Sequence, residues 1–88
     1  MKEIKLHFGC GKSVLPGHKG VDISPQSGVS VVCDLAKDYW PFSDSSVDAC
    51  ALHNLLEHLP DTIHVMEELW RVTKPGGVVH IQVPYYNS

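Results

Sequence analysis

Residues with ligand-binding chemistry follow the first three predicted strands of the chain. Gly9, Cys10 and Gly11 come directly after the first strand, and a glycine lets backbone amides approach a ligand that a Cβ atom would block. Asp22 and Asp34 end the next two apolar segments, and a carboxylate in that place can accept hydrogen bonds from ribose hydroxyls. Each residue alone also suits an ordinary turn. Together they predict one ligand-binding edge, because the carboxyl ends of parallel strands meet there.

Two common phosphate-binding motifs do not fit this glycine segment. The run 11–13 (GKS) looks like the end of a P-loop, but that motif needs a glycine where Leu6 stands. The dinucleotide fingerprint needs a third small residue where Val14 stands, followed by a helix facing the pyrophosphate. Pro16 and Gly17 leave no space for that helix. A cofactor that carries a pyrophosphate is therefore disfavoured.

The segment after the fourth predicted strand contains His53, Glu57 and His58, which suggests metal binding. His53 and His58 are five residues apart, which on a helix is a rotation of about 140°. They would not share a face, and the segment matches neither common zinc-protease motif. We therefore expect no metal site at these residues. His64 and His80 are expected to be surface histidines.

Apolar alternation and turn residues predict five short strands and one helix. The predicted strands are 3–8, 20–23, 29–33, 47–52 and 78–83, and the predicted helix is 61–73. Strands separated by long connections and a helix indicate an α/β fold with a mostly parallel sheet. We expect one Rossmann-like domain over residues 1–88.

The predicted helix has a clear beginning and a candidate buried face. Asp61 can cap it, because its carboxylate can accept hydrogen bonds from the free amides of the first turn. The apolar and small residues at helical spacing predict a buried stripe. The members of that stripe are Ile63, Met66, Leu69, Trp70 and Thr73.

Composition excludes several classes of protein. The chain has 88 residues, 43% of them hydrophobic, and a net charge of −3, which is typical of a single globular domain. No cluster of Lys and Arg exists, so nucleic-acid binding is disfavoured. Neither a signal peptide nor a membrane-spanning stretch is evident. The three cysteines suggest no disulfide framework, which favours a cytoplasmic location.

Five segments in order resemble the class I S-adenosylmethionine-dependent methyltransferases. The segments are LHFGCG, VDIS, CDLAKDYWPFSDSSVDAC, HNLLEHLPD and ELWRVTKPGGVVHIQVP. Each is weak alone, but five in register are specific, and they cover nearly the whole chain. The resemblance implies S-adenosyl-L-methionine as a small-molecule cofactor and methyl transfer as the activity, and it leaves the methyl acceptor open.

The resemblance also implies roles for individual residues. Gly9, Cys10 and Gly11 would lie against the methionine part of the cofactor, and Asp22 would bind the ribose hydroxyls. Asp34 and the backbone of Leu35 would bind adenine. Leu52 and His53 would lie beside the methyl group, with His53 and His58 as the catalytic candidates.

The chain departs from the family pattern in two places. The glycine segment lacks its third glycine and following helix, and family members continue beyond the fifth strand. We therefore expect a fold truncated after that strand, from a fragment, a shortened gene product or half of an assembly. The alternative to an active enzyme is a non-catalytic cofactor-binding module that needs a partner chain, or a remnant that binds nothing. We expect a homo-oligomer or a partner chain that completes the fold through the fifth strand, the open sheet face or the segment around Tyr85 and Tyr86.

Overall fold

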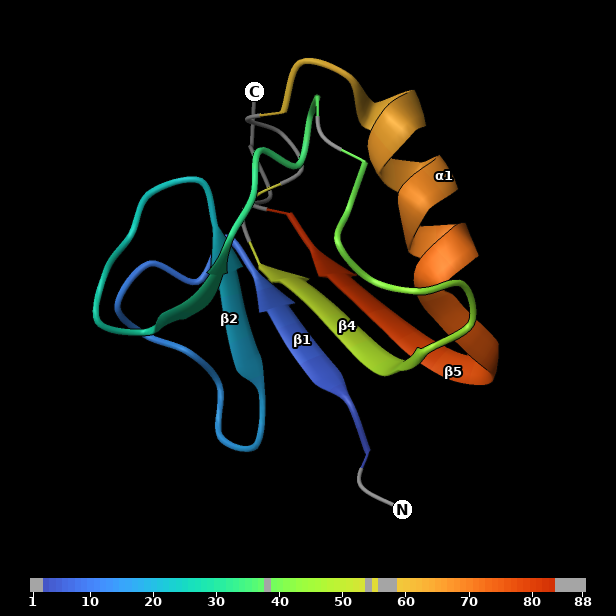
Figure 1. The fold of residues 1–88 in the computed structure, drawn as a ribbon, viewed down its shortest axis with the longest axis horizontal. Helices are drawn as coiled ribbons and strands as arrows, with labels where there is room; N and C mark the ends of the chain where they lie inside the picture. The colour runs from blue at the N-terminus through green and yellow to red at the C-terminus, as the bar shows by residue number, and fades with distance from the viewer. Residues whose placement is uncertain (1–2, 38, 54, 56–58, 84–88) are drawn as a thin grey trace.

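The computed structural model describes residues 3–37, 39–53, 55 and 59–83. They form one sheet and one helix, shown in Figure 1. The elements are β1 (Lys5–Phe8), β2 (Lys19–Asp22), β3 (Val29–Val32), β4 (Val47–His53), α1 (Thr62–Val72) and β5 (Thr73–Gln82). The predicted α/β class is confirmed. Within these residues, no helix is long and apolar enough to cross a membrane.

The sheet is parallel throughout, with the strand order β3-β2-β1-β4-β5. The order places β1 in the centre, and the chain moves outward from it first through β2 and β3 and then through β4 and β5 (Figure 1). The reversal of direction lies between β1 and β4. In open α/β sheets such a switch point, at the carboxyl ends of the strands, is where ligands bind.

The boundaries of the last strand differ from the sequence prediction. The strand begins at Thr73 instead of residue 78, because α1 already ends at Val72 and the chain turns directly into the sheet. Val47 pairs with Thr73 and Ala49 with Val78, so the register shifts between these two pairs. Pro75, Gly76 and Gly77 are therefore part of an irregular strand.

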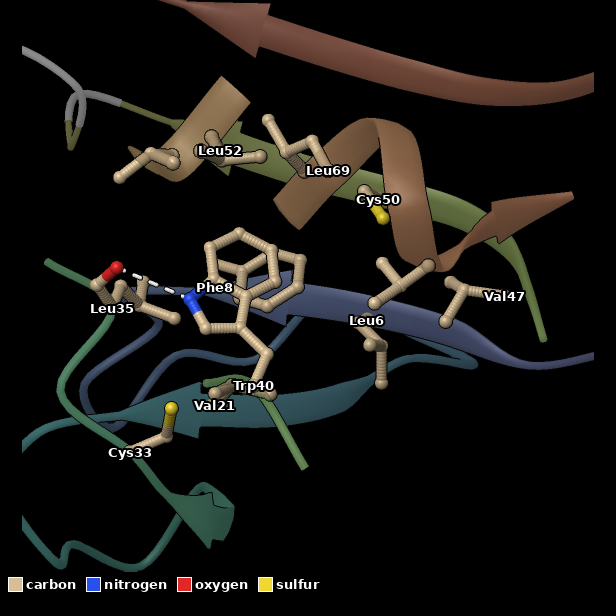
Figure 2. Close-up of a cluster of buried hydrophobic side chains, with 12 residues drawn as sticks. Leu6, Phe8, Val21, Cys33, Leu35, Trp40, Val47, Cys50, Leu52 and Leu69 are labelled. Atoms are coloured by element: carbon tan, nitrogen blue, oxygen red, sulfur yellow. Dashed lines mark hydrogen bonds between the residues drawn. The ribbon is translucent and has the colours of Figure 1, made fainter. Parts of the chain in front are cut away.

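One face of the sheet carries the hydrophobic core. Figure 2 shows Phe8 on β1 stacked against the indole of Trp40, with ring centroids 4.8 Å apart. Leu6 and Phe8 alternate with outward residues on β1, as Cys50 and Leu52 do on β4. This face is covered by helix α1 and by the segment that connects β3 to β4. The core consists of Leu6, Phe8, Val21, Cys33, Leu35, Trp40, Val47, Cys50, Leu52, Val65, Leu69 and Val72.

Helix α1 turns a different face inward from the one that the sequence predicts. Leu69 is buried as expected, but Ile63, Met66 and Trp70 are 74%, 45% and 85% exposed. Thr73 is the C-cap and not a helical residue. The helix has two apolar stripes, and the inner one is Val65, Leu69 and Val72 with Glu68 between them. Glu68 lies on this inner face, where its carboxylate accepts a hydrogen bond from the Trp40 amide, and the larger stripe is left exposed.

The cap at the beginning of α1 is confirmed. The Asp61 carboxylate accepts a hydrogen bond from the amide of His64 at 3.0 Å. It thereby satisfies one of the amides that the first helical turn leaves without an intrahelical partner.

A buried ion pair fastens the β3–β4 connection to the helix. The Glu68 carboxylate accepts a hydrogen bond from the Trp40 amide at 2.8 Å and from Arg71 Nε at 2.8 Å. Arg71 also donates to the carbonyls of Trp40 and Phe42 and to the Asp44 carboxylate. The bond to Arg71 keeps the pKa of Glu68 below its usual value. The connection is therefore held by charge as well as by apolar packing.

Replacing Glu68 should destabilise the fold more than replacing any exposed acid on α1. Glu68→Ala leaves the buried Trp40 amide and the Arg71 guanidinium without their partner, at a cost of about 2–4 kcal/mol. Denaturant unfolding measures this difference. Glu67→Ala, one position away on the exposed side, is the matched control and should cost less than about 0.5 kcal/mol. Equal losses in the two variants would show that the ion pair does not support the fold.

Candidate functional site

A pocket of about 360 Å³ lies at the carboxyl ends of the first three strands. Gly9 follows β1, Asp22 ends β2, and Asp34 comes two residues after β3. Gly9, Asp22 and Asp34 therefore lie around one pocket. The sequence could predict this only on the assumption that the strands are parallel. The lining residues are Gly9, Asp22, Ile23, Cys33, Asp34, Leu35, Ala36, Lys37, Leu55, Leu59 and Pro60.

The Asp22 carboxylate links the pocket to the glycine segment. Oδ2 accepts a hydrogen bond from the Gly11 amide at 2.9 Å, and Oδ1 accepts one from the Ile23 amide at 2.7 Å. A carboxylate offers about four lone-pair sites, so acceptor capacity remains for a ligand. Asp22 is half-buried, which keeps it in reach of a molecule in the pocket. The Gly11 amide, which the sequence assigns to a ligand, instead orients this carboxylate.

Two features of the structure require a glycine at position 9. Its φ angle of 67° lies in the left-handed region, which other residues rarely adopt. A Cβ atom there would also lie 2.7 Å from Leu55 Cδ1. The Gly9 amide donates to the Val21 carbonyl at 2.7 Å, which closes β1 onto β2. Leu55 can therefore lie directly against the strand end and form one wall of the pocket.

Asp34 and Leu35 form the opposite side of the pocket. Asp34 Oδ1 accepts a hydrogen bond from the Ala36 amide at 3.1 Å, which fixes a tight turn. Leu35 is buried, and its carbonyl accepts the Trp40 indole N–H at 3.1 Å, the dashed line in Figure 2. Trp40 in turn is bound to Glu68. The pocket wall is thus continuous with the ion pair that holds α1.

Cys10 and Gly11 do not line the pocket. The Cys10 side chain points into the loop packing, where its thiol lies 3.7 Å from the Gly28 carbonyl. A Cβ atom on Gly20 would lie 2.5 Å from that sulfur, so Gly20 leaves room for it. Burial raises the pKa of the Cys10 thiol, which keeps it uncharged. Only the backbone of this segment remains near the pocket edge.

Leu52 and His53, the last two residues of β4, are not part of the pocket lining. Leu52 is fully buried in the core against α1. His53 alternates with it on β4 and points to the other face of the sheet, where its ring lies 5.5 Å from that of His7 and 5.2 Å from that of His80. His58 lies outside the described residues. The catalytic roles of His53 and His58 stay predictions.

Sequence reasoning missed the apolar wall formed by Leu55, Leu59 and Pro60, and it missed Lys37 at the rim. Leu55 and Leu59 lie in the same segment as the histidines that the sequence analysis considered for metal binding. The four-residue spacing of these leucines was the available signal for an apolar wall. With Asp22 and Asp34, the pocket combines apolar walls with two carboxylates and one cation. Such a lining suits a flat apolar ring that carries hydroxyl or amino donors.

Comparison with known proteins shows the family. The model of the methyltransferase domain family matches residues 6–81, from β1 almost to the end of β5. The chain therefore belongs to the class I S-adenosylmethionine-dependent methyltransferase family, as the resemblance predicted.

Individual relatives match over a shorter stretch. A protein named as an uncharacterized methyltransferase from Mycobacterium sp. (strain KMS) is 50% identical over 38 residues, which are 43% of this chain and 15% of the relative. A similarly named protein from Mycobacterium tuberculosis (strain ATCC 25618 / H37Rv) is 51% identical over 39 residues, 44% of this chain and 15% of the relative. The alignment thus spans about a seventh of these relatives. No solved structure matches the chain.

The loop that carries the glycines is fastened by a histidine whose charge state matters. His7 Nδ1 accepts a hydrogen bond from the Leu15 amide at 3.1 Å, and His7 is only 6% exposed. Burial, followed by the charges of His53 and His18, lowers the pKa of His7. An imidazole protonated on both nitrogens cannot accept the Leu15 N–H. The neutral form is therefore the one compatible with the folded loop.

Stability should fall on acidification because of His7. Its folded pKa lies below the unfolded value near 6.5, so its contribution is complete above that value and is lost as the pH falls through the folded pKa. His7→Gln keeps a possible acceptor for Leu15 and does not titrate. Its unfolding free energy should decline less between pH 7 and pH 5, by a slope difference of at most about 1.4 kcal/mol per pH unit. Parallel pH profiles for the variant and the parent chain would contradict this account.

Proposed function

We propose that this chain forms the S-adenosyl-L-methionine-binding part of a methyltransferase. One observation carries the proposal: a single pocket in a chain of this family joins Gly9, Asp22 and Asp34 at the carboxyl ends of β1, β2 and β3. Its volume of about 360 Å³ lies within the range of small-molecule sites. The lining fits a nucleoside, because apolar walls flank the carboxylates of Asp22 and Asp34, which can accept hydrogen bonds from hydroxyl and amino groups.

The residues around the pocket have distinct tasks in this proposal. Asp22 accepts hydrogen bonds from the ribose hydroxyls, while Gly11 and Ile23 hold its carboxylate in place. Asp34 and Leu35 take the adenine end. Leu55 covers the cofactor from the side of β4 and excludes water. These contacts bind and orient the cofactor. Positioning of the reactants is the main contribution that a methyl transfer needs from the protein.

The cofactor would supply an electrophilic methyl group on a positively charged sulfur. The acceptor and its binding elements are not assigned by this pocket. Where the acceptor nucleophile carries a proton, a base is needed. His53 and His58 are the proposed candidates for that base.

A non-catalytic cofactor-binding module is the second candidate. The observation that favours it is that the charged residues in the described lining are Asp22, Asp34 and Lys37, and no histidine is part of that lining. A radiolabelled methyl-transfer assay over mixed acceptors distinguishes the two. Incorporation of label supports the enzyme, while cofactor binding without incorporation supports the module.

Asp22→Ala should weaken cofactor binding strongly. Hydrogen bonds to a charged acceptor contribute about 1.5–3 kcal/mol, so the dissociation constant should rise on the order of tenfold to a hundredfold. Calorimetric titration with S-adenosylmethionine and S-adenosylhomocysteine measures this.

NAD and ATP should produce no comparable thermal stabilisation, because the loop after β1 offers no helix N-terminus for their phosphates.

Two further variants make the Asp22 experiment specific. Asp22→Asn retains an oxygen that can accept from the Gly11 amide, so it separates loss of charge from loss of the loop contact. Glu67→Ala removes an exposed acid far from the pocket lining and should bind like the parent chain. An unchanged dissociation constant in a folded Asp22→Ala variant would show that the ribose is placed wrongly.

We also propose that the chain associates with itself through the β5 side. β5 is an edge strand of the described sheet, and Val78 on it is exposed, as are Ile63 and Trp70 on the neighbouring helix. Unpaired strand edges and apolar patches favour association. Light scattering after size exclusion should give a mass above that of one chain. A monodisperse monomer at high concentration would refute this proposal.

A further inference from the structure

Three histidines from three neighbouring strands gather on the sheet face opposite the core. His7 on β1 pairs in register with Ala51 on β4, and Ala51 pairs with His80 on β5. His53 is two residues beyond Ala51 and therefore projects from the same face. His53 Nε2 lies 3.5 Å from His80 Nδ1, with the two rings nearly perpendicular at 84°.

The separation of these two nitrogens allows a hydrogen bond between the two rings, and it is also close to the spacing of two ligands on one metal ion. With metal–nitrogen distances of 2.0–2.1 Å, two imidazoles at a tetrahedral angle have nitrogens about 3.4 Å apart. A square-planar arrangement would bring neighbouring nitrogens to about 2.9 Å, which fits less well. We propose that His53 and His80 together bind one divalent metal ion with tetrahedral preference, for which Zn²⁺ is the test ion.

His7 is a neighbour of this pair and not a third ligand. Its Nδ1 accepts the Leu15 amide, so the neutral ring carries its proton on Nε2 and has no free lone pair. In agreement, the described residues contain no group of three or more His, Cys, Asp or Glu side chains arranged for a metal. The remaining coordination positions are left for water or an external ligand.

The proposed site is independent of the cofactor pocket. Neither His53 nor His80 is among the pocket-lining residues. It also differs from the His53, Glu57 and His58 set that the sequence spacing excluded. The partner of His53 is 27 residues away in the chain, and only the register of β4 and β5 brings the two together.

Metal titration of the chelator-treated protein tests the proposal. Zn²⁺ in competition with a chromophoric chelator should give one saturable site per chain, and Co²⁺ should give the intense visible absorption of tetrahedral coordination. His53→Gln and His80→Gln should each lose this site. His64→Gln changes a histidine on α1 outside the trio and should retain it.

Several outcomes would overturn the proposal. They are the absence of a saturable site in the parent chain, retention of the site in both glutamine variants, or its loss on cysteine-to-serine substitution while both histidines are intact. Circular dichroism of each variant shows whether the fold is kept. Two separate variants guard against misfolding of one, since His53 is only half-buried and His80 is exposed. Titration with S-adenosylhomocysteine reports separately on the cofactor pocket, so the two proposals can fail independently.

Discussion

The buried carboxylate of Glu68 is the contact on which the rest of this small fold depends. It binds the Trp40 amide and the Arg71 side chain at once, and so joins the long β3–β4 connection to α1. Trp40 links this contact to the pocket wall. Its indole packs against Phe8, and its indole N–H donates a hydrogen bond to the Leu35 carbonyl. Without this contact, one side of the pocket would have no fixed position.

A second polar contact shapes the other side of the pocket. Asp22 accepts from the Gly11 amide, which fixes the glycine loop over the end of β2. His7 supports the same loop from the opposite face through the Leu15 amide. The loop is therefore anchored at two points despite its glycines and prolines. The same carboxylate that orders the loop also presents its free lone pairs to the pocket, so folding and binding share one group.

The local sequence pattern was sufficient to predict the strands and the polar or glycine residues at their ends. Alternation predicted five strands, and the residue types at their ends predicted that Gly9, Gly11, Asp22 and Asp34 would share one edge. Gly9, Asp22 and Asp34 line one pocket there, while Gly11 contributes its amide to the Asp22 carboxylate. Periodicity could not choose between the two apolar stripes of α1, because both have helical spacing. The choice is made by Glu68, whose partner Trp40 is 28 residues away. The pairing of His53 with His80 depends on strand register in the same way, and no local motif encodes it.

The central claim is that the edge formed by β1, β2 and β3 holds a nucleoside cofactor. Backbone amide chemical-shift mapping during titration with S-adenosylhomocysteine tests it most directly, because it locates the ligand without requiring an acceptor. The account predicts saturable shifts concentrated at Gly9, Ile23, Leu35 and Ala36, with little change along the outer face of α1. Saturable shifts confined to the face that carries His53 and His80, or none at all, would contradict it.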